Sequence, residues 1–492
     1  MPVIRPMSLL DAAMFGMETA ETPMHLGGAC IFRMPEDAGP DYVRRLYEAW
    51  RGIKVTRSPL NYRLTRTAVT DIRPAWEVLE HVDLGQHLFH LALPEPGGRR
   101  ELSELTGRLH STLLDRSRPL WEIYLIERLG GRRFATYTKI HHALTDGTNA
   151  MRIFMSPLSE DPEARDNLPA WGAPAPAAGR QSRRIQGGSD GITGIARKLG
   201  TVYGSARGIY QGISRLPLVA ADLERLFRTD LPSPDSVLNG PVTDRRVTDS
   251  VMLKLARIRA VGKAAGATVN DVALAVCGGA LRRYLQEIGQ LPSDSLRALV
   301  PVSLRKDGDE RGGNTATAMT APLGTNIADA GKRLAIIGAA TRAGKEWLQN
   351  TATDAAKTLR ALLLVAPVAA EQLSGVRLLG RSPFNLVISN VPGPLRKLYL
   401  YGAELERIIP DFLVGPGMAL SILLTSYHDR LCINVTACPD RLPNVQRIYP
   451  LLEECFAELE GSIRSPTRTA RARKTPGPGK KGQRARRAPS HQ

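Results

Sequence analysis

Residues 120–158 restrict the possible folds more than any other part of the sequence. The runs 120–129 and 134–140 are rich in β-branched and aromatic residues and flank Gly130-Gly131, which predicts a β-hairpin. After a short polar corner, apolar residues at helical spacing predict a helix over 149–158. The order is therefore strand, corner, helix, and such a corner is a common place for functional side chains.

The corner reads Lys139-Ile-His-His-Ala-Leu-Thr-Asp-Gly-Thr148. Imidazole accepts a proton near neutral pH, and adjacent side chains on an extended chain point in different directions. We therefore expect one of His141 and His142 to face a cavity as a catalytic residue and the other to pack or hydrogen-bond behind it. Asp146 is expected to cap the helix or pair with an arginine, and Gly147 to permit a tight corner that a side chain would obstruct.

Two histidines and an acid also fit a metal site or a purely structural cluster. A metal site needs a third strong ligand, and no other histidine lies within easy motif spacing of His141 and His142. The sequence therefore favours a site without metal.

The second half of the chain alternates predicted helices and strands, which implies an α/β or α+β domain. The expected helices cover about 256–265 and 271–288, and the expected strands cover 296–304, 385–389, 417–424 and 431–437. A chain of 492 residues is long enough for two domains. We assign them to residues 1–158 and 241–464.

The remaining segments have a different composition. Residues 159–240 are predicted to be a linker or crossover, in which an apolar stripe from Ile192 to Leu216 and nearby arginines and lysines indicate a basic amphipathic helix. Residues 465–492 carry nine of the Lys/Arg residues and no acid, so half of the formal charge of +18 belongs to a tail predicted to be disordered. The tail has no aromatic residue to stack on bases, which argues against specific nucleic-acid binding as the main function.

The cysteine pattern and the N-terminus bear on the compartment. Five scattered cysteines without CxxC spacing argue against a disulfide framework, a zinc site and secretion. The N-terminus lacks the apolar core of a signal peptide, and no run is long enough to span a membrane. A cytoplasmic protein is expected.

Several motifs carry a resemblance to a known family. His141-His-Ala-Leu-Thr-Asp-Gly147 matches the HHxxxDG signature of the CoA-dependent acyltransferase superfamily. Further matches, in the same order over residues 7–460, are Leu9-Leu-Asp-Ala12, Thr22-Pro-Met-His-Leu-Gly-Gly28, Arg118-Pro-Leu-Trp121, Val269-Asn-Asp271, Pro301-Val-Ser-Leu-Arg305 and Ser389-Asn-Val-Pro-Gly-Pro394. Together these motifs resemble the bacterial wax ester synthase/acyl-CoA:diacylglycerol acyltransferase (WS/DGAT) family.

The resemblance implies two chloramphenicol acetyltransferase-like α/β domains with mixed sheets and an active-site tunnel between them. It implies transfer of a long-chain fatty acyl group from acyl-CoA to diacylglycerol, a long-chain alcohol or both. His142 would be the general base, with His141 in support and Asp146 organising the loop. Acyl-CoA would be a co-substrate, with no permanently bound cofactor.

Other candidate residues lie far from the motif in sequence. Asn270, Ser389 and Asn390 are candidates for the oxyanion donor or the wall of the active site. Each has a structural alternative, because Asn270 is also suited to cap a helix beginning at Asp271 and Ser389-Asn390 to end a strand.

Three further residues have predicted roles. Arg305 and Arg63 are candidate partners of Asp146. For Trp121 we favour core packing over a role in the wall of an acyl pocket.

Insoluble lipid products favour an enzyme at the inner face of the plasma membrane or on lipid droplets. The 192–216 helix would dock it on anionic lipid or else pack on the protein body. Two alternatives remain open: an acyltransferase or condensation-type enzyme with another nucleophile, such as an amine or a polyketide hydroxyl, and an idle member that binds lipid. No oligomeric state follows from the sequence.

Overall fold

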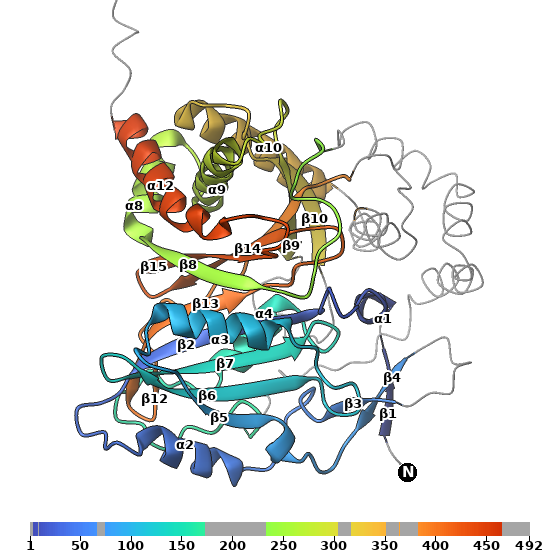
Figure 1. Ribbon diagram of the computed structural model, residues 1–492, viewed down its shortest axis with the longest axis vertical. Helices are drawn as coiled ribbons and strands as arrows, with labels where there is room; N and C mark the ends of the chain where they lie inside the picture. Colours follow the sequence, from blue (N-terminus) through green and yellow to red (C-terminus); the bar gives the residue numbers. More distant parts are fainter. Residues whose placement is uncertain are drawn as a thin grey trace, which may run out of the picture.

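Two six-stranded mixed sheets, one above the other in Figure 1, form the body of the protein. The computed structural model describes residues 3–7, 9–65, 74–172, 233–303, 316–350, 364 and 382–464. The predicted amphipathic helix of residues 192–216, the basic tail and Arg305 lie outside these residues.

The first sheet has the strand order β12-β13-β2-β7-β6-β5. Its strands are β12 (Tyr399–Leu400), β13 (Ala403–Asp411), β2 (His25–Arg33), β7 (Arg133–His141), β6 (Trp121–Leu129) and β5 (Leu88–Ala92). Only β5 and β6 pair in parallel, and the other neighbours are antiparallel. Helix α2 (Tyr42–Arg51) contacts β5 and β6, whereas α3 (Arg99–Ser111) contacts both β2 and strand β8 (Val247–Lys254) of the second sheet.

The second sheet has the order β10-β9-β11-β14-β15-β8. Besides β8, its strands are β10 (Ala316–Pro322), β9 (Arg297–Ser303), β11 (Leu386–Asn390), β14 (Leu420–Tyr427) and β15 (Arg430–Ala437). It is covered by the helices α8 (Leu255–Ala265), α9 (Val269–Glu287), α10 (Ala330–Asn350) and α12 (Ile448–Arg464). The largest apolar cluster lies between this sheet and these helices, with almost every residue of α9 from Asp271 to Leu285 buried.

Small elements complete the fold. A three-stranded sheet of order β1-β4-β3 lies beside the first sheet, and helix α4 follows β7. These elements are β1 (Val3–Pro6), α1 (Leu9–Gly16), β3 (Tyr62–Leu64), β4 (Ala75–Val78), α4 (Gly147–Met155) and the short 3₁₀ helices η1 (Leu84–Gln86) and η2 (Val445–Arg447).

The described elements agree with the two-domain α/β (α+β) class predicted from the sequence. The predicted hairpin appears as β6 and β7, joined through Gly131 with a φ of 75°. The predicted strands of the second half appear as β9, β11, β14 and β15, with ends displaced by up to three residues. Alternation and turn residues are local signals, which is why they locate these elements.

Residues 399–411 join the first sheet although they lie within the range assigned to the C-terminal domain. Strand β13 pairs antiparallel with β2, with Asp411 opposite Gly27 and Glu404 opposite Arg33. No local pattern predicts that β13 joins the first sheet, because its partner strand β2 is more than 370 residues away in the chain. One apolar cluster therefore contains residues of both domains, such as Phe32 and Ile140 of the first sheet and Val387 and Leu423 of the second.

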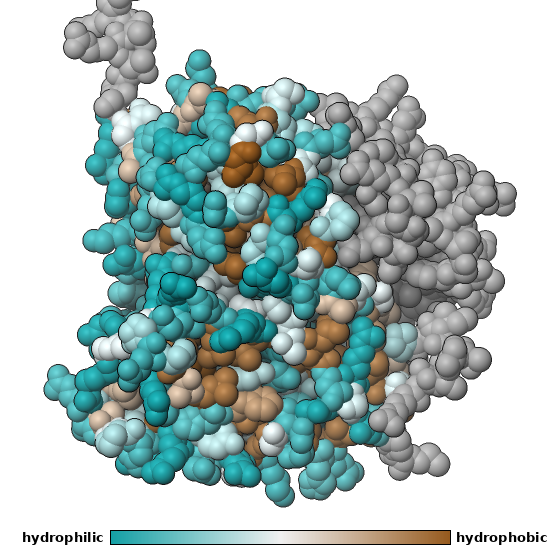
Figure 2. All heavy atoms as spheres, in the orientation of Figure 1, coloured by the Kyte–Doolittle hydropathy of each residue, from teal (hydrophilic) through white to brown (hydrophobic). Residues whose placement is uncertain are grey.

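Within the described residues, no single helix is long and apolar enough to cross a bilayer. Helices α8 and α9 meet that criterion only as a pair, and the pair is bent by 98°. On the face shown in Figure 2 the surface is largely hydrophilic, with apolar patches interrupted by polar side chains.

Candidate active site

The two adjacent histidines lie at the end of β7. His141 is the last residue of that strand and is fully buried, whereas His142 is half-buried just beyond it and donates its backbone N–H to the Met24 oxygen at 2.8 Å. The alternation of the strand places His141 on the side of Tyr137 and Lys139 and directs His142 to the opposite side. The structure therefore gives the neighbouring histidines different surroundings.

The surroundings of His142 favour its neutral form. Burial lowers the pKa of His142, and the nearby His141 ring acts in the same direction, against the raising effects of its own backbone carbonyl and of Asp146. A neutral imidazole has a free nitrogen lone pair, which a general base requires. His142 is thus suited to accept a proton at neutral pH.

His141 is held from behind by a buried carboxylate. Its Nδ1 accepts the Ala143 N–H at 3.0 Å, and its Nε2 lies 3.3 Å from Glu18 Oε1. Glu18 also accepts hydrogen bonds from the Met24 N–H at 3.0 Å and from Arg116 Nη2 at 2.9 Å. Burial raises the pKa of Glu18, but these partners outweigh burial and leave that pKa below its usual value.

Glu18→Gln tests this support. The glutamine keeps the shape but loses the charge that holds His141 and Arg116, so we expect the free energy of unfolding at pH 7 to fall by about 1–3 kcal/mol. Because the pKa of Glu18 is lowered in the fold, its stabilisation is present above the unfolded pKa and is lost as the pH falls through the folded pKa. Urea unfolding at pH 7 and pH 3 measures both effects. An equal difference between variant and parent at the two pH values would contradict the assignment.

Asp146 and Gly147 form the start of α4. Asp146 is the N-cap, and its Oδ1 accepts the Asn149 N–H at 2.8 Å. Gly147 is the first helical residue, and a Cβ at that position would lie 3.3 Å from Val391 Cγ2. The absence of a side chain at Gly147 therefore allows the corner to lie close to Val391, the first residue after β11 in the second domain.

Asn270 and Asn390, 120 residues apart, are brought together. Asn390 Nδ2 donates a hydrogen bond to Asn270 Oδ1 at 3.3 Å. Asn270 is not the cap of α9, because that helix begins at Val269 and Thr268 forms a reciprocal capping box with Asp271. Ser389 is buried near the end of β11. The second domain thus places an amide pair beside the residue that contacts Gly147.

The other predicted residues have separate surroundings. Arg63 forms an ion pair with Glu77, with 2.7 Å between Nη2 and Oε2. Trp121 is buried in the core, where its Nε1 donates to the Leu60 oxygen at 2.7 Å and its ring stacks on His87 and Trp171. These contacts agree with core packing of Trp121.

A narrow pocket lies between the domains beside Gly147. It is lined by Leu26, Gly27, Gly28, Cys30, Thr136, Thr138, Gly147, Ala150, Met151, Phe154, Met155, Val391, Ile408, Pro410, Asp411, Phe412 and Leu423, which are mostly apolar. Its cavity volume is about 40 Å³, so a ligand longer than a few atoms needs side chains such as Met151 to move. Burial raises the pKa of Cys30 to about 12, which argues against a thiolate nucleophile in this pocket.

Sequence reasoning missed a buried polar cluster on the side of His141. His25 lies opposite His141 on β2 and contacts the His110 oxygen through Nε2 at 2.7 Å. Lys139 Nζ lies 3.1 Å from Glu122 Oε2 and donates to the oxygens of Leu109 and Thr112. In the sequence, His25 and Lys139 appear only within quoted motifs, and no local pattern predicts that either residue, or Glu18, is a buried polar residue near His141.

In the described parts of the chain, no group of three or more His, Cys, Asp and Glu side chains is arranged to hold a metal ion.

Comparison with known proteins agrees with this geometry. Residues 7–273 match the wax ester synthase/diacylglycerol acyltransferase catalytic domain, and residues 312–460 match the WS/DGAT C-terminal domain. A Mycobacterium tuberculosis protein provisionally named a diacylglycerol O-acyltransferase is 38% identical over 457 residues, covering 93% of this chain and 100% of the relative. O-acyltransferase WSD of Acinetobacter baylyi is 35% identical over 474 residues, covering 94% and 98%.

Solved structures show the same similarity. The wax ester synthase/diacylglycerol acyltransferase from Marinobacter aquaeolei VT8 superimposes with a TM-score of 0.75 at 35% identity, over 94% of this chain and 100% of that one. The first condensation domain of the calcium-dependent antibiotic synthetase shares the fold, with a TM-score of 0.58 at 19% identity. The chain therefore belongs to the wax ester synthase/diacylglycerol acyltransferase family.

Proposed function

We propose that this chain transfers a long-chain fatty acyl group from acyl-CoA to diacylglycerol, to a long-chain alcohol, or to both. Family membership and the names of the relatives support this activity. The observation that carries it is the position of His142. Its pKa is lowered by burial, and it follows β7 on the side of the strand from which Thr136 and Thr138 line the apolar pocket.

The proposed reaction needs one proton carrier. As the acceptor oxygen attacks the thioester carbonyl carbon, His142 takes the hydroxyl proton. The tetrahedral intermediate then collapses, the carbon–sulfur bond breaks, and the CoA thiolate takes the proton from the imidazolium. The products are an ester and free CoA.

The oxyanion of the intermediate needs a hydrogen-bond donor. We propose the Asn270–Asn390 pair, because its hydrogen bond orients both amides and uses the Asn270 oxygen, not the Asn270 amide hydrogens that an oxyanion requires. Their location beside Val391, which contacts Gly147, brings these donors to the HHxxxDG corner.

Thiol release from palmitoyl-CoA, with hexadecanol or dioleoylglycerol as acceptor, tests the activity. We expect CoA release that depends on the lipid acceptor, together with an ester product identified by mass spectrometry. Release with an amine acceptor but with neither lipid would instead support a condensation-type enzyme.

Met151→Trp tests the pocket as the acyl site. Met151 is half-buried on α4 and lines the pocket, so the larger ring is expected to raise the KM for palmitoyl-CoA by about tenfold, and that for octanoyl-CoA much less. Arg152→Trp, at the exposed next position of the same helix, is the matched control. Equal changes for both acyl lengths would place the acyl chain elsewhere.

We also propose that the enzyme works in the cytoplasm, peripherally attached to the plasma membrane or to lipid droplets. The insolubility of the lipid acceptors and products supports this location, as does the basic 465–492 segment, since each basic residue near an anionic surface contributes about 1 kcal/mol. Flotation of the full chain with anionic vesicles, compared with a chain truncated at residue 464, tests the attachment.

A further inference from the structure

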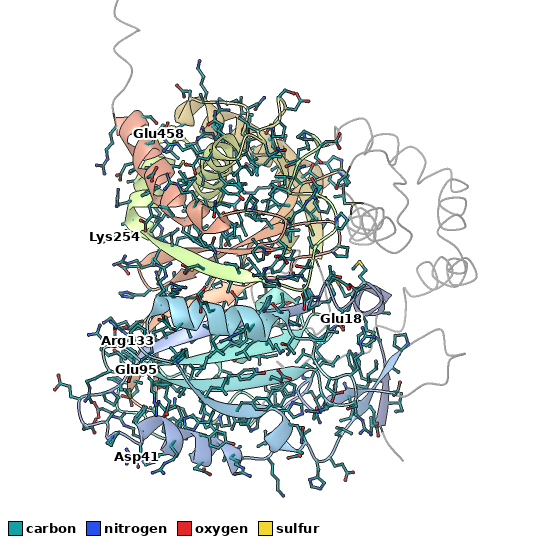
Figure 3. All side chains as sticks on the ribbon, viewed as in Figure 1. Glu18, Asp41, Glu95, Arg133, Lys254 and Glu458 are labelled. Atoms are coloured by element: carbon teal, nitrogen blue, oxygen red, sulfur yellow. The ribbon has the colours of Figure 1, made fainter. Side chains whose placement is uncertain are left out.

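A second cavity lies in the interdomain crevice, at the end of the first sheet remote from the histidines. Its volume is about 700 Å³, within the usual size of small-molecule sites. Figure 3 shows Glu18, next to His141, and Arg133, which lines this cavity, at opposite ends of the first sheet.

Strand register separates this cavity from the active site. Arg407 of the cavity is opposite Ile31 on β2, whereas His141 is opposite His25. Six residues of extended strand correspond to about 20 Å. Ile31 and His25 are an even number of residues apart on β2, so their side chains point to the same side of the sheet, the side that α3 covers. The cavity therefore lies on the same side as His141 and on the opposite side from His142.

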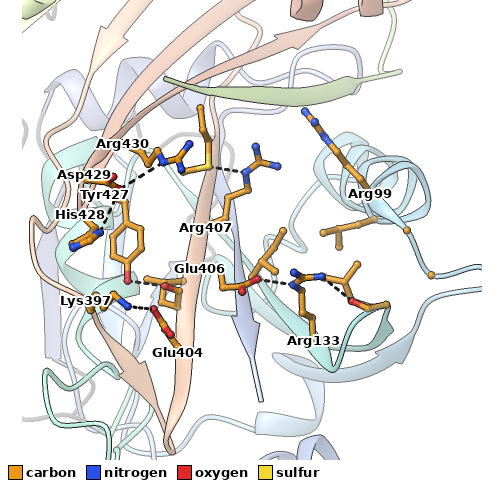
Figure 4. Close-up of a pocket in the computed structure, with 18 residues that line it drawn as sticks. Arg99, Arg133, Lys397, Glu404, Glu406, Arg407, Tyr427, His428, Asp429 and Arg430 are labelled. Carbon is orange, nitrogen blue, oxygen red and sulfur yellow. Dashed lines mark hydrogen bonds and ion pairs between the residues drawn. The ribbon is translucent and has the colours of Figure 1, made fainter. Parts of the chain in front are cut away.

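The lining of the cavity is rich in cations. It contains five arginines and lysines against three acids, and Figure 4 labels all eight. The cations are Arg99, Arg133, Lys397, Arg407 and Arg430, and the acids are Glu404, Glu406 and Asp429.

Most of these cations have a carboxylate partner. Arg133 Nε lies 2.6 Å from Glu406 Oε2, and Lys397 Nζ lies 2.7 Å from Glu404 Oε1. Arg99 Nη2 lies 2.6 Å from the Oδ1 of Asp249, a residue outside the lining. These side chains are held in place by their own ion pairs and form a preorganised wall.

Arg407 is the exception. Its side chain is half-buried, and its Nε donates to Met252 Sδ at 2.8 Å (Figure 4), although a thioether is a weak acceptor. Within the described residues no carboxylate forms an ion pair with its guanidinium. Burial lowers the pKa of Arg407, and the nearby charges of Arg99 and Arg430 act in the same direction, against the raising effects of Cys432 and Asp249. A charge in this position is costly unless an anion compensates it.

The start of α3 adds to the positive potential. This 13-residue helix begins at Arg99, after the N-cap Gly98, and both residues line the cavity. The N-terminal end of a helix carries a partial positive charge and favours anions. The Glu101 carboxylate already caps part of this end, since its Oε2 accepts the Gly98 N–H at 2.7 Å. The case for an anionic ligand therefore rests chiefly on Arg407.

We propose that this cavity binds a phosphate group, carried either by a soluble phosphate compound or by the headgroup of an anionic lipid. Guanidinium groups bind phosphate oxygens in a bidentate manner, and Arg407 has donors left for such a ligand. The site is separate from the acyl transfer centre and does not depend on the proposed reaction.

The test is binding to the full-length protein with two probes. Inorganic pyrophosphate is titrated by calorimetry, and vesicles of phosphatidylcholine with or without phosphatidic acid are used in flotation. Arg407→Gln removes the unpaired cation, Arg430→Gln is the second variant, and Arg44→Gln, an exposed position on α2, is the control with the same loss of charge.

We expect Arg407→Gln to weaken binding by about tenfold or more, because the variant loses the charge and the charge-assisted hydrogen bonds that the guanidinium would donate to phosphate. Arg430→Gln should weaken it in the same direction, and Arg44→Gln should leave it unchanged. Loss of pyrophosphate binding identifies a soluble phosphate compound, and loss confined to phosphatidic acid vesicles identifies a headgroup. Absence of binding to both probes, or equal binding by the parent and both cavity variants, would overturn the proposal.

Discussion

Replacement of His142 by alanine is expected to reduce acyl transfer about 100- to 10,000-fold while the fold remains intact. The His142 residue is half-buried just after β7, and burial lowers the pKa of its imidazole, so the ring is neutral at pH 7 and available to take the hydroxyl proton. No described cysteine is a plausible substitute near the pocket, because Cys30 has a pKa raised to about 12.

The measurement is thiol release from palmitoyl-CoA with hexadecanol or dioleoylglycerol, with circular dichroism to check the fold. His90→Ala is the matched control, since His90 is a half-buried histidine on β5 that contacts Glu127. In the parent, kcat/KM should fall on the acid side with a midpoint below about 6.5, because His142 must be unprotonated. A His142→Ala variant with parental turnover would require a different base.

Asp411→Asn is expected to change how stability depends on pH. Asp411 is fully buried at the end of β13, where its Oδ1 accepts hydrogen bonds from Thr248 Oγ1 and from Asn434 Nδ2. Among the described residues its Oδ2 has no hydrogen-bond partner, and no arginine or lysine forms an ion pair with it. Burial raises the pKa of Asp411 to about 7.

The sign of the effect follows from this raised pKa. Between about pH 4 and pH 7 the unfolded chain releases the Asp411 proton while the folded protein keeps it, so stability falls as the pH rises through this range. A shift of about three units corresponds to a difference on the order of 4 kcal/mol. Asparagine does not titrate, so Asp411→Asn should gain stability relative to the parent by up to that amount between pH 4 and pH 8.

Urea unfolding across this pH range, monitored by tryptophan fluorescence, measures the effect. Asp440→Asn serves as the control, because Asp440 pairs with Arg245 at the surface and is not buried in the interface. Parallel pH profiles for the parent and Asp411→Asn would show that Asp411 is ionised in the fold. Glu18→Gln should show the opposite trend, since hydrogen bonds from Met24 and Arg116 and the contact with His141 lower the pKa of that carboxyl.

Much of the fold could be predicted because its signals are local. The hairpin around Gly130-Gly131 and the helix after the corner follow from turn residues and apolar periodicity within a few tens of residues. The N-cap of α9 is Thr268, two residues before Asn270, the cap that the sequence suggested. Both residue types are suitable caps, and only the reciprocal hydrogen bonds with Asp271 select Thr268.

The sequence by itself determined the family, through motifs in a fixed order, and the position of the HHxxxDG corner between a strand and a helix. The tertiary structure alone decided which side chains surround that corner. Glu18 behind His141, the Asn270–Asn390 pair and the contact of Arg407 with Met252 all depend on strand pairing and domain contact between residues far apart in the chain. Such contacts leave no periodic pattern, because the free energy that fixes them comes from burial and long-range pairing and not from local backbone preference.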